Sequence, residues 1–533
     1  MPRRRFLWLL MGFFLTAAAQ TGELPRSAPV DEGVNPALLN SFVHKLVTLP
    51  DVDVHHMMVM RHGKVIGEWH AAPYEADHLH TLYSASKTIT ALAMGIAIND
   101  GLLTVDDKVS KFLRDKMPAT LSPALDSLTV RHLLMMAAGR EQDFSIFEGD
   151  ADWLTTWFSG TFSGVGKVFN YDSMCTHALA VIISRVTGQR LLDYVRVRLF
   201  MPLHITRADW ELAPDSVETA GWGLRLDTES QAKLGQLMLQ GGSWNGKQLV
   251  SPQWIKDMAH MHLGPDKVKK RKLSLWERFV RSLRRAWHTI RSWFTGYNVD
   301  DYYKGYGYQT RILHQPLAES IFASGYGGQL IDYIPKLDMV IIINGRANDY
   351  GDELNTIYYE FLEPLARGDE INGKAEVKPL AIALPQGIGA HQLESRLFKS
   401  TISLKDNLLG LKSIEVRRQG DDRIFTMTDN RGPLRAIAAC GQWRFTTSDE
   451  RPIYIMESRD QLVGTQRPFT SIAAYGWKDD TLALRLDWLD GGDNRRMKIA
   501  FDNDSVTVFV IDNFDHLLTD TIRGKLEIRH ERH

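Results

Sequence analysis

The spacing of apolar and polar positions divides the chain into two parts. Residues 25–370 alternate apolar runs of strand length with amphipathic stretches of helix length, which is typical of an α/β or α+β domain. Residues 56–69 predict two strands that meet at a His62-Gly63 turn. Residues 88–99 are apolar on all sides and predict a central helix, and residues 129–139, from a capping-type threonine to a glycine, predict another.

From about residue 385 the pattern changes to short alternating runs, for example over residues 441–446, 481–488 and 506–510. Asp-Gly and Asn-Asp turn residues separate these runs. The sequence therefore predicts a second, all-β domain over residues 385–533, folded as a small barrel or sandwich. None of its residues is a candidate for chemistry.

The N-terminus has the pattern of an export signal. Arg3, Arg4 and Arg5 precede an apolar run over residues 6–15 and small residues up to Ala19. This order predicts a secretory signal peptide over residues 1–19 and a periplasmic or extracellular protein. The apolar run is too short to favour a stable membrane span. A twin-arginine export signal and a retained N-terminal anchor remain as alternatives.

Composition narrows the function classes. A length of 533 residues fits two domains, and 44% apolar with 24% charged residues is ordinary for a soluble globular protein. The net charge of −1 provides no global attraction to nucleic acid or membranes. The two cysteines, Cys175 and Cys440, exclude a disulfide framework and are expected to be buried. The histidine pairs lack carboxylate or cysteine partners, so we expect neither metal nor cofactor.

A serine followed three residues later by a lysine occurs twice, at Ser84 and Lys87 and at Ser230 and Lys233. On a helix this spacing brings the amine over the serine, and a buried amine of lowered pKa can take up the serine's proton. Ser84 stands where an irregular segment enters the apolar helix, whose free N–H groups can stabilise an oxyanion. Ser230 and Lys233 are expected on a solvated polar helix face.

The segment Ser84-Ala-Ser-Lys87 resembles the active-site motif of class C β-lactamases, DD-peptidases and related esterases. The resemblance runs in collinear order over residues 30–365. It implies a β-lactamase/transpeptidase-like domain over residues 25–370, with an antiparallel sheet flanked by helices and a helical subdomain. It also implies that Ser84 is the nucleophile of an acyl-enzyme. Phe169-Asn-Tyr-Asp-Ser173 matches the second family motif, so the resemblance implies that Tyr171 relays protons and that Ser173 is its polar companion.

Residues 322–329 occupy the place of the third family motif, a strand along the binding cleft. Gly325 stands where the family carries lysine or histidine, which removes a charge-assisted contact to a substrate carboxylate and argues against strong β-lactamase activity. Tyr326 follows, and Gly327 and Gly328 permit close backbone approach, so an N–H near Gly328 is expected to join the Ser84 N–H as an oxyanion donor.

Ser173 together with residues 325–329 resembles the branch with 6-aminohexanoate-oligomer hydrolases and carboxylesterases, which implies hydrolysis of an ester or amide. A DD-peptidase acting on cell-wall peptides is the enzyme alternative. A catalytically silent binding protein of the same fold is the alternative from another class.

Residues 264–298 stand outside the family pattern as a basic amphipathic insertion. Between residues 267 and 291 ten Lys or Arg stand against one acid, Glu277. The helical spacing predicts one apolar face, which includes the candidate membrane-binding residues Trp276, Phe279, Leu283, Trp287 and Ile290. A basic helix with aromatic residues on its apolar face suits an anionic membrane surface. Packing on the hydrolase or β domain, and a protein partner, remain as alternatives.

Overall fold

The chain forms two compact units. The computed structural model describes residues 22–49, 52–147, 152–263, 305–315, 317–347, 354, 356–369, 377, 379–430, 432–448, 469–489, 491–512 and 518–529. The first unit comprises Met1–Ala71, Thr81–Leu380 and Asp460–Thr465, and the second comprises Ala72–His80, Ala381–Arg459 and Gln466–His533. The expected signal peptide and the basic insertion, with its five candidate membrane-binding residues, lie outside the described residues.

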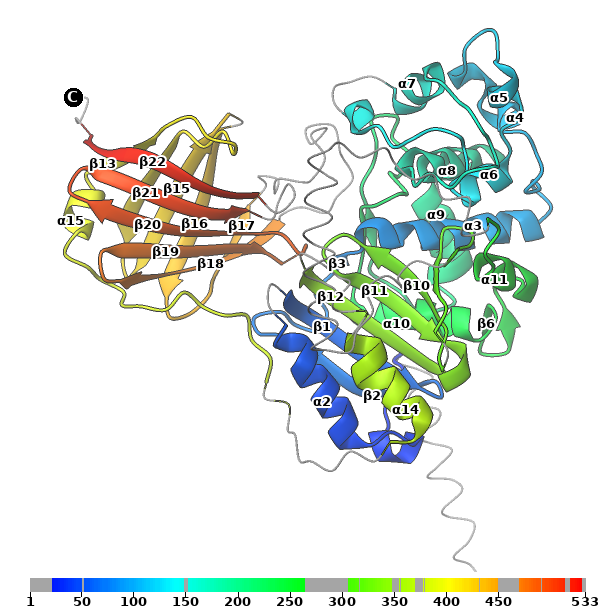
Figure 1. The fold of residues 1–533 in the computed structure, drawn as a ribbon, viewed down its shortest axis with the longest axis horizontal. Helices are drawn as coiled ribbons and strands as arrows, with labels where there is room; N and C mark the ends of the chain where they lie inside the picture. The colour runs from blue at the N-terminus through cyan, green and yellow to red at the C-terminus, as the bar shows by residue number, and fades with distance from the viewer. Residues whose placement is uncertain are drawn as a thin grey trace, which may run out of the picture. The chain divides into compact units, whose positions relative to one another are not determined.

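The first unit is built on a seven-stranded antiparallel sheet of order β2-β1-β12-β11-β10-β9-β8 (Figure 1). Its strands are β1 (Val52–Arg61), β2 (Lys64–His70), β8 (Gly305–Tyr306), β9 (Arg311–Leu313), β10 (Ser320–Gly325), β11 (Gln329–Ile334) and β12 (Met339–Ala347). The predicted hairpin is confirmed, because β1 and β2 are joined by His62 and Gly63, both in the left-handed conformation that a tight hairpin turn requires.

Both faces of this sheet are covered by helices. On one face α2 (Pro36–Val47), η9 (Tyr358–Leu362) and α14 (Glu363–Arg367) close an apolar core, in which the rings of Phe42 and Phe361 stack at 4.8 Å. On the other face α10 (Thr228–Leu239) packs so closely that a Cβ at Gly235 would lie 2.6 Å from Val340 of β12. Because successive strand residues point to opposite faces, a strand that is covered on both sides needs apolar residues at consecutive positions. The strand β12 has such a run and is buried along its whole length.

A helical subdomain completes the first unit around two long buried helices, α3 (Ser86–Asn99) and α8 (Ser173–Thr187). The central helix predicted over residues 88–99 is confirmed. The helix predicted over residues 129–139 is shorter, because α6 covers only Val130–Leu134 and Met136 then takes a left-handed φ of 56° that no helix continues. Thr129 and His132 do form a capping box at its start.

The remaining helical elements of the first unit are short. They are η1 (Pro29–Glu32), η2 (Tyr83–Ala85), α4 (Ser110–Leu113), η3 (Arg114–Lys116), α5 (Pro123–Asp126), η4 (Phe144–Phe147), α7 (Trp153–Ser159), α9 (Leu191–Val195), η5 (Arg196–Phe200), α11 (Pro252–Met258) and η8 (Pro335–Leu337). Two small sheets, of order β3-β5-β4 and β6-β7, contain β3 (His80–Thr81), β4 (Asp209–Trp210), β5 (Leu224–Leu226), β6 (Ser243–Trp244) and β7 (Lys247–Gln248).

The second unit is a closed β-barrel, one of the two forms that the alternating runs predict. Its strands are β13 (Ser400–Leu404), β14 (Ser413–Gln419), β15 (Asp422–Asp429), β16 (Gly432–Cys440), β17 (Arg444–Ser448), β18 (Phe469–Lys478), β19 (Thr481–Trp488), β20 (Asn494–Asp502), β21 (Ser505–Asp512) and β22 (Leu518–Ile528). Parallel pairing of β16 with β18 closes the ring, and β17 continues along the same edge of β18. Apolar side chains fill the interior, and the short helix α15 (Glu394–Leu397) packs against it (Figure 1).

The two cysteines lie in different units and are not bonded to each other. Cys175 is buried, as predicted, whereas Cys440 is only partly buried, because it ends β16 near the surface of the barrel. Among the described residues, no helix combines the length and the apolar character that crossing a bilayer requires.

Candidate active site

Ser84 lies in a constrained turn directly before α3. The Leu82 N–H donates to the Leu224 carbonyl at 2.8 Å, Tyr83 takes a left-handed φ of 44°, and the 3-10 turn η2 then leads into the helix. Left-handed backbone is rare for a residue with a side chain and costs free energy that the surrounding packing must offset. Ser84 is partly exposed while its neighbours are buried, so its hydroxyl is accessible from a rigid support.

The Lys87 side chain is buried behind Ser84 and is only 1% exposed. Its Nζ lies 3.1 Å from Ser84 Oγ and donates to the Gly221 carbonyl at 2.6 Å. Burial lowers the pKa of this ammonium group, because the charged form loses its hydration. An amine of lowered pKa next to a serine hydroxyl is equipped to take up the serine's proton.

The carbonyl of Gly221 is a part of the site that sequence reasoning missed. Ala220 takes a left-handed φ of 61°, and the Gly221 N–H donates back to the Thr219 carbonyl at 2.6 Å. This tight turn aims the Gly221 carbonyl at the lysine. A Cβ at position 221 would lie 3.2 Å from Ser173 Cβ and 3.5 Å from Lys87 Nζ, so the turn leaves little room for a side chain. No motif spacing signals a backbone acceptor of this kind.

Tyr171 joins Ser84 and Lys87 from the start of α8. Lys87 Nζ lies 4.8 Å from the centre of its ring, and the Ser84 and Lys87 side chains both lower the pKa of its hydroxyl. Burial raises the pKa of this phenol, but the positive charges of Lys87 and Arg311 outweigh that effect and hold the pKa below its ordinary value. The structure therefore brings together the three residues that the sequence singles out for chemistry.

Asp172 and Ser173 fix the start of α8, directly after Tyr171. Asp172 caps α8 by accepting from the Met174 N–H at 2.9 Å, and it also accepts from Trp157 Nε1 at 2.8 Å. Burial raises the pKa of Asp172 to about 6, and those two hydrogen bonds oppose the rise. Ser173 is buried, and its N–H donates to Gln142 Oε1 at 2.7 Å.

At the end of β10, Gly325 stands where the family carries a lysine or histidine, and it lets the backbone of β10 lie close to the segment that carries Ser84. A Cβ at Gly325 would lie 2.0 Å from the Leu82 carbonyl oxygen, so no lysine or histidine fits there while β10 keeps this distance from the nucleophile segment. The next residue, Tyr326, packs its ring edge-on against Tyr83 at 5.7 Å and accepts a hydrogen bond from Arg346 at 3.0 Å.

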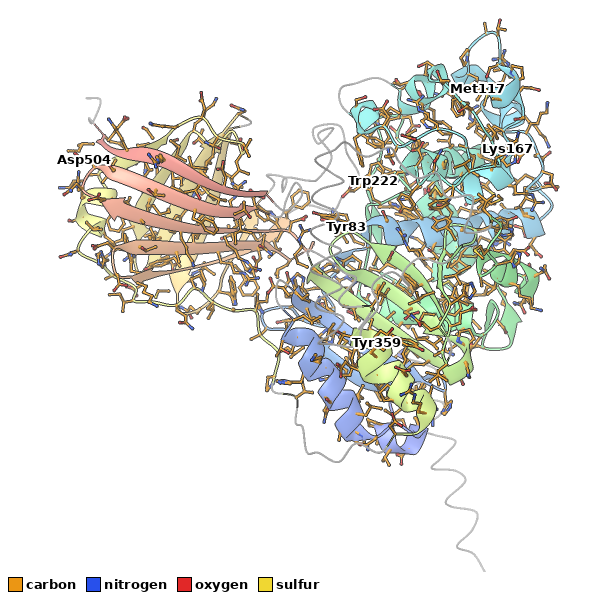
Figure 2. All side chains as sticks on the ribbon, in the orientation of Figure 1. Tyr83, Met117, Lys167, Trp222, Tyr359 and Asp504 are labelled. Atoms are coloured by element: carbon orange, nitrogen blue, oxygen red, sulfur yellow. The ribbon has the colours of Figure 1, made fainter. Side chains whose placement is uncertain are left out.

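Gly327 and Gly328 have left-handed φ angles of 76° and 90°, as the turn between β10 and β11 requires. The second oxyanion donor is expected at an N–H near Gly328; the Gly328 N–H itself donates to the Gly325 carbonyl at 3.3 Å within that turn. Tyr83 and Trp222, the chain neighbours of Ser84 and Gly221, are labelled in Figure 2 and mark the site within the first unit.

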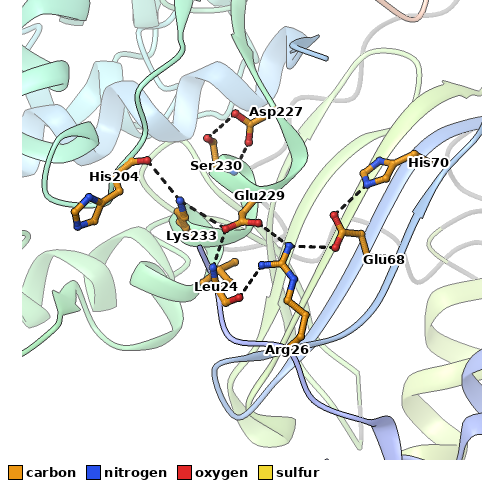
Figure 3. Close-up of polar contacts among 9 residues, drawn as sticks. All are labelled: Leu24, Arg26, Glu68, His70, His204, Asp227, Glu229, Ser230 and Lys233. Atoms are coloured by element: carbon orange, nitrogen blue, oxygen red, sulfur yellow. Dashed lines mark hydrogen bonds and ion pairs between the residues drawn. The ribbon is translucent and has the colours of Figure 1, made fainter. Parts of the chain in front are cut away.

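The second serine–lysine pair has a different environment, and its predicted exposure to solvent is wrong. Ser230 and Lys233 are 4% and 5% exposed, because this face of α10 is covered by the loop of His204 and by the N-terminal segment. Figure 3 shows the resulting network, in which Ser230 donates to Asp227 at 2.9 Å and Lys233 Nζ lies 3.7 Å from Glu229. Arg26 extends this network to Glu68 and His70.

One group of side chains in the described part of the chain has the geometry to hold a metal ion. Glu75, Asp77 and His78 bring one ligand atom each within 4.8 Å of one another. Two of them are exposed, and the His78 ring accepts a hydrogen bond from the Glu75 N–H at 3.1 Å. Exposed acidic groups often lie this close without a metal, so the spacing alone does not assign a metal site.

Comparison with known proteins gives a family match over more than half of the chain. The sequence profile of the family described as Beta-lactamase matches residues 52–360. A 6-aminohexanoate-dimer hydrolase of Paenarthrobacter ureafaciens is 25% identical over 280 residues, which cover 48% of this chain and 70% of that protein. Penicillin-binding protein 4* of Bacillus subtilis is 25% identical over 177 residues, covering 30% of this chain and 37% of that protein. The solved octameric penicillin-binding protein homologue from Pyrococcus abyssi aligns with a TM-score of 0.45 at 15% identity, over 92% of this chain and 99% of that one.

Proposed function

Because the chain belongs to the Beta-lactamase family, we propose that it hydrolyses an ester or amide through an acyl-enzyme on Ser84, with Lys87 and Tyr171 moving the protons. The observation that carries this proposal is the convergence of the three side chains. Lys87 Nζ is 3.1 Å from Ser84 Oγ and 4.8 Å from the centre of the Tyr171 ring. A serine hydroxyl becomes an effective nucleophile only when a neighbouring base takes its proton.

In the first half of the proposed reaction, Ser84 Oγ attacks the substrate carbonyl carbon. The proton of the hydroxyl passes to the Lys87 and Tyr171 pair as the new O–C bond forms. The Ser84 N–H, directly before α3, is positioned at a helix start and stabilises the negative oxygen that develops. Tyr171 then returns the proton to the leaving oxygen or nitrogen as its bond to the acyl carbon breaks.

In the second half, water attacks the acyl-enzyme and gives one proton to the same pair. When the Ser84 ester breaks, that proton returns to Ser84 Oγ and the acid product leaves. Lys87 is suited to this repeated transfer because burial lowers its pKa while the Gly221 carbonyl fixes the position of its amine.

Position 325 favours esters and simple amides over β-lactams as substrates. The close backbone contact with Leu82 leaves no room for the cation that holds a carboxylate in the β-lactamase pattern. The name of the Paenarthrobacter relative, 6-aminohexanoate-dimer hydrolase, supports the same substrate class, because an amide bond joins two such amino acids. A DD-peptidase is the competing activity, supported by the name of the Bacillus subtilis relative.

A substrate panel with two serine variants tests the proposal. Purified protein is assayed on p-nitrophenyl esters, short linear amides and D-amino-acid peptides. Ser84→Ala is expected to abolish turnover, and Ser230→Ala, which changes the other serine–lysine pair, is expected to retain it. Full activity of Ser84→Ala would refute the proposal. Labelling by a fluorescent penicillin together with cleavage of D-amino-acid peptides alone would favour the DD-peptidase.

We also propose that the protein is exported and binds an anionic membrane surface, and both proposals rest on sequence alone. The basic residues between 267 and 291 each contribute about 1 kcal/mol near an anionic bilayer. Deletion of residues 267–296 is expected to abolish co-sedimentation with vesicles that contain phosphatidylglycerol and to leave ester hydrolysis in solution intact. Equal sedimentation of both proteins would contradict membrane binding.

A further inference from the structure

Two positive charges contact the ring of Tyr171 from different elements. Lys87 Nζ, from α3, lies 4.8 Å from the ring centre, and the guanidinium carbon of Arg311, from β9, lies 5.2 Å from it. Cations at these distances are attracted by the ring of a phenol, and the attraction grows when the phenol loses its proton. Arg311 belongs to none of the three motifs, and sequence reasoning did not single it out.

The sheet determines how Arg311 reaches the site. Arg311 pairs with Phe322 of β10 on one side and with Tyr306 of β8 on the other, which places it one strand away from Gly325. Position 325 is closed to side chains by the Leu82 carbonyl. A cation can therefore not come from the end of β10, and the neighbouring strand β9 provides one.

A serine hydroxyl, a second phenol and a carboxylate also lie close to Tyr171. The Ser84 hydroxyl lowers the pKa of the phenol, and the Tyr306 ring meets the Tyr171 ring edge-on at 6.2 Å. Burial raises the pKa of Tyr306 well above its ordinary value, so this neighbour stays a neutral phenol. Asp172, the next residue in the chain, directs its carboxylate to Met174 and Trp157.

We propose that Arg311 promotes ionisation of Tyr171, supplying from β9 the positive charge that position 325 cannot carry. The inference rests on the proposed function, because it assigns Arg311 to tuning the proton-transfer pair. Arg311 acts through Tyr171, because it places a positive charge beside the ring of that phenol. It is therefore a positioning residue. The phenolate that it stabilises takes the Ser84 proton as the O–C bond forms and returns it to the leaving group.

The electrostatics of the site agree with this role. Burial alone would raise the pKa of Tyr171, and the combined charges of Lys87 and Arg311 bring it below its ordinary value. Arg311 also lowers the pKa of Lys87, in addition to the larger effect of burial. Loss of the guanidinium charge therefore raises both pKa values, and the basic form of the pair then appears only at higher pH.

The first test compares pH profiles of kcat/KM on a p-nitrophenyl ester. In Arg311→Gln, the acidic limb of the profile is expected to move up by roughly one to two pH units, because one charge about 5 Å away is lost. Arg311→Lys is expected to return the acidic limb most of the way to its wild-type position. Arg196→Gln, which changes an exposed arginine paired with Asp193, is expected to leave the limb unmoved. An unchanged acidic limb in Arg311→Gln overturns the inference.

The second test reads Tyr171 directly. The ultraviolet absorbance of tyrosinate is titrated in wild type and in Tyr171→Phe, and the difference is assigned to Tyr171. This difference titration is expected to move to higher pH in Arg311→Gln and to return towards wild type in Arg311→Lys. If Arg311→Gln does not fold, Arg311→Met, which also removes the charge, takes its place, and an unmoved midpoint with an unmoved limb in that variant contradicts the inference.

Failure of this inference and failure of the proposed function give different results. If Ser84→Ala keeps full activity, the acyl-enzyme proposal fails whatever Arg311 does. If Ser84→Ala is inactive while the Arg311 variants keep the wild-type limb and midpoint, only the role of Arg311 fails.

Discussion

Ser84 and Ser230 are each followed by a lysine at the third position, yet their surroundings give them different chemistry. Lys87 is buried between a serine hydroxyl, a backbone carbonyl and the ring of Tyr171. Lys233 is also buried, but its amine forms an ion pair with Glu229 at 3.7 Å. At the scale of single residues, the partner of the lysine distinguishes a candidate base from a structural cation.

This contrast predicts the outcome of matched lysine variants. Lys87→Met removes the amine of the proposed proton-transfer pair while keeping a similar volume, and it is expected to lower kcat/KM by about two orders of magnitude or more. Lys233→Met is expected to lower thermal stability with kcat/KM almost unchanged at a temperature where it is folded. Steady-state kinetics and thermal unfolding of both variants provide the measurement, and equal losses of kcat/KM would contradict the distinction.

Asp332 predicts a pH dependence of stability. It lies on β11 on the same side as Leu330 and Ile334, in an apolar core, and burial raises its pKa to about 8 while Ser320 opposes the rise. A carboxyl whose pKa is raised in the folded state binds more protons folded than unfolded. Its contribution to stability is therefore complete below about pH 4, the range of its unfolded pKa, and is lost as the pH rises through about 8.

The free energy of unfolding is expected to fall by up to about 1.4 kcal/mol per pH unit in this window because of Asp332. Asp332→Asn removes the titration, so its unfolding curve in urea should change less between about pH 5 and about pH 9. Parallel losses in both proteins would show that other groups cause the dependence.

At the scale of elements, the strands and long helices follow from the sequence, and the contacts that complete the site do not. The β1–β2 hairpin and α3 are local patterns of turn residues and continuous apolar character, so they could be predicted. The shortened α6 depends on the left-handed Met136, which no local signal marks. Lys233 is buried by the loop of His204, which lies far from it in the sequence. The periodicity of a single helix does not record such a tertiary contact.

The start of α8 connects element stability to the site. Trp157→Phe keeps most of the buried ring but removes the hydrogen bond to the Asp172 carboxylate. The variant is expected to lose about 1.5–3 kcal/mol of unfolding free energy, the usual contribution of a hydrogen bond to a charged group. Chemical denaturation measures this loss. Trp254→Phe, whose indole donates to the uncharged Ala91 carbonyl, is the control and is expected to lose less.

At the scale of the whole molecule, the two units have separate cores that the change in apolar spacing near residue 385 anticipates. The barrel follows from the alternating strands, because every second side chain points into the interior. Membership of Ala72–His80 in the second unit was not predictable, since this segment lies between β2 and β3 in the sequence. Its placement depends on pairing of Ala72 with Ala381, a contact that a single sequence does not encode locally.

The second unit contains a buried ion pair with a measurable role. Arg423 donates two hydrogen bonds of 2.8 Å to Glu394 of α15, and Trp477 Nε1 donates a third at 3.1 Å. Glu394→Ala leaves the arginine charge without this partner and is expected to cost about 3–5 kcal/mol. Arg417→Ala, which breaks an exposed pair with Glu415, is expected to cost at most about 1 kcal/mol. Urea unfolding of both variants makes the comparison, and similar costs would contradict the role of the buried pair.

The most direct measurement of the central claim is peptide mapping of the protein after brief reaction with a fluorophosphonate. The proposed mechanism predicts one phosphonyl adduct on the peptide that contains Ser84, with none in Ser84→Ala and a normal adduct in Ser230→Ala. Reaction should slow strongly in Lys87→Met, because the proton-transfer pair that activates the hydroxyl then lacks its amine. An adduct on another serine, or equal labelling of Ser84→Ala, would contradict the account.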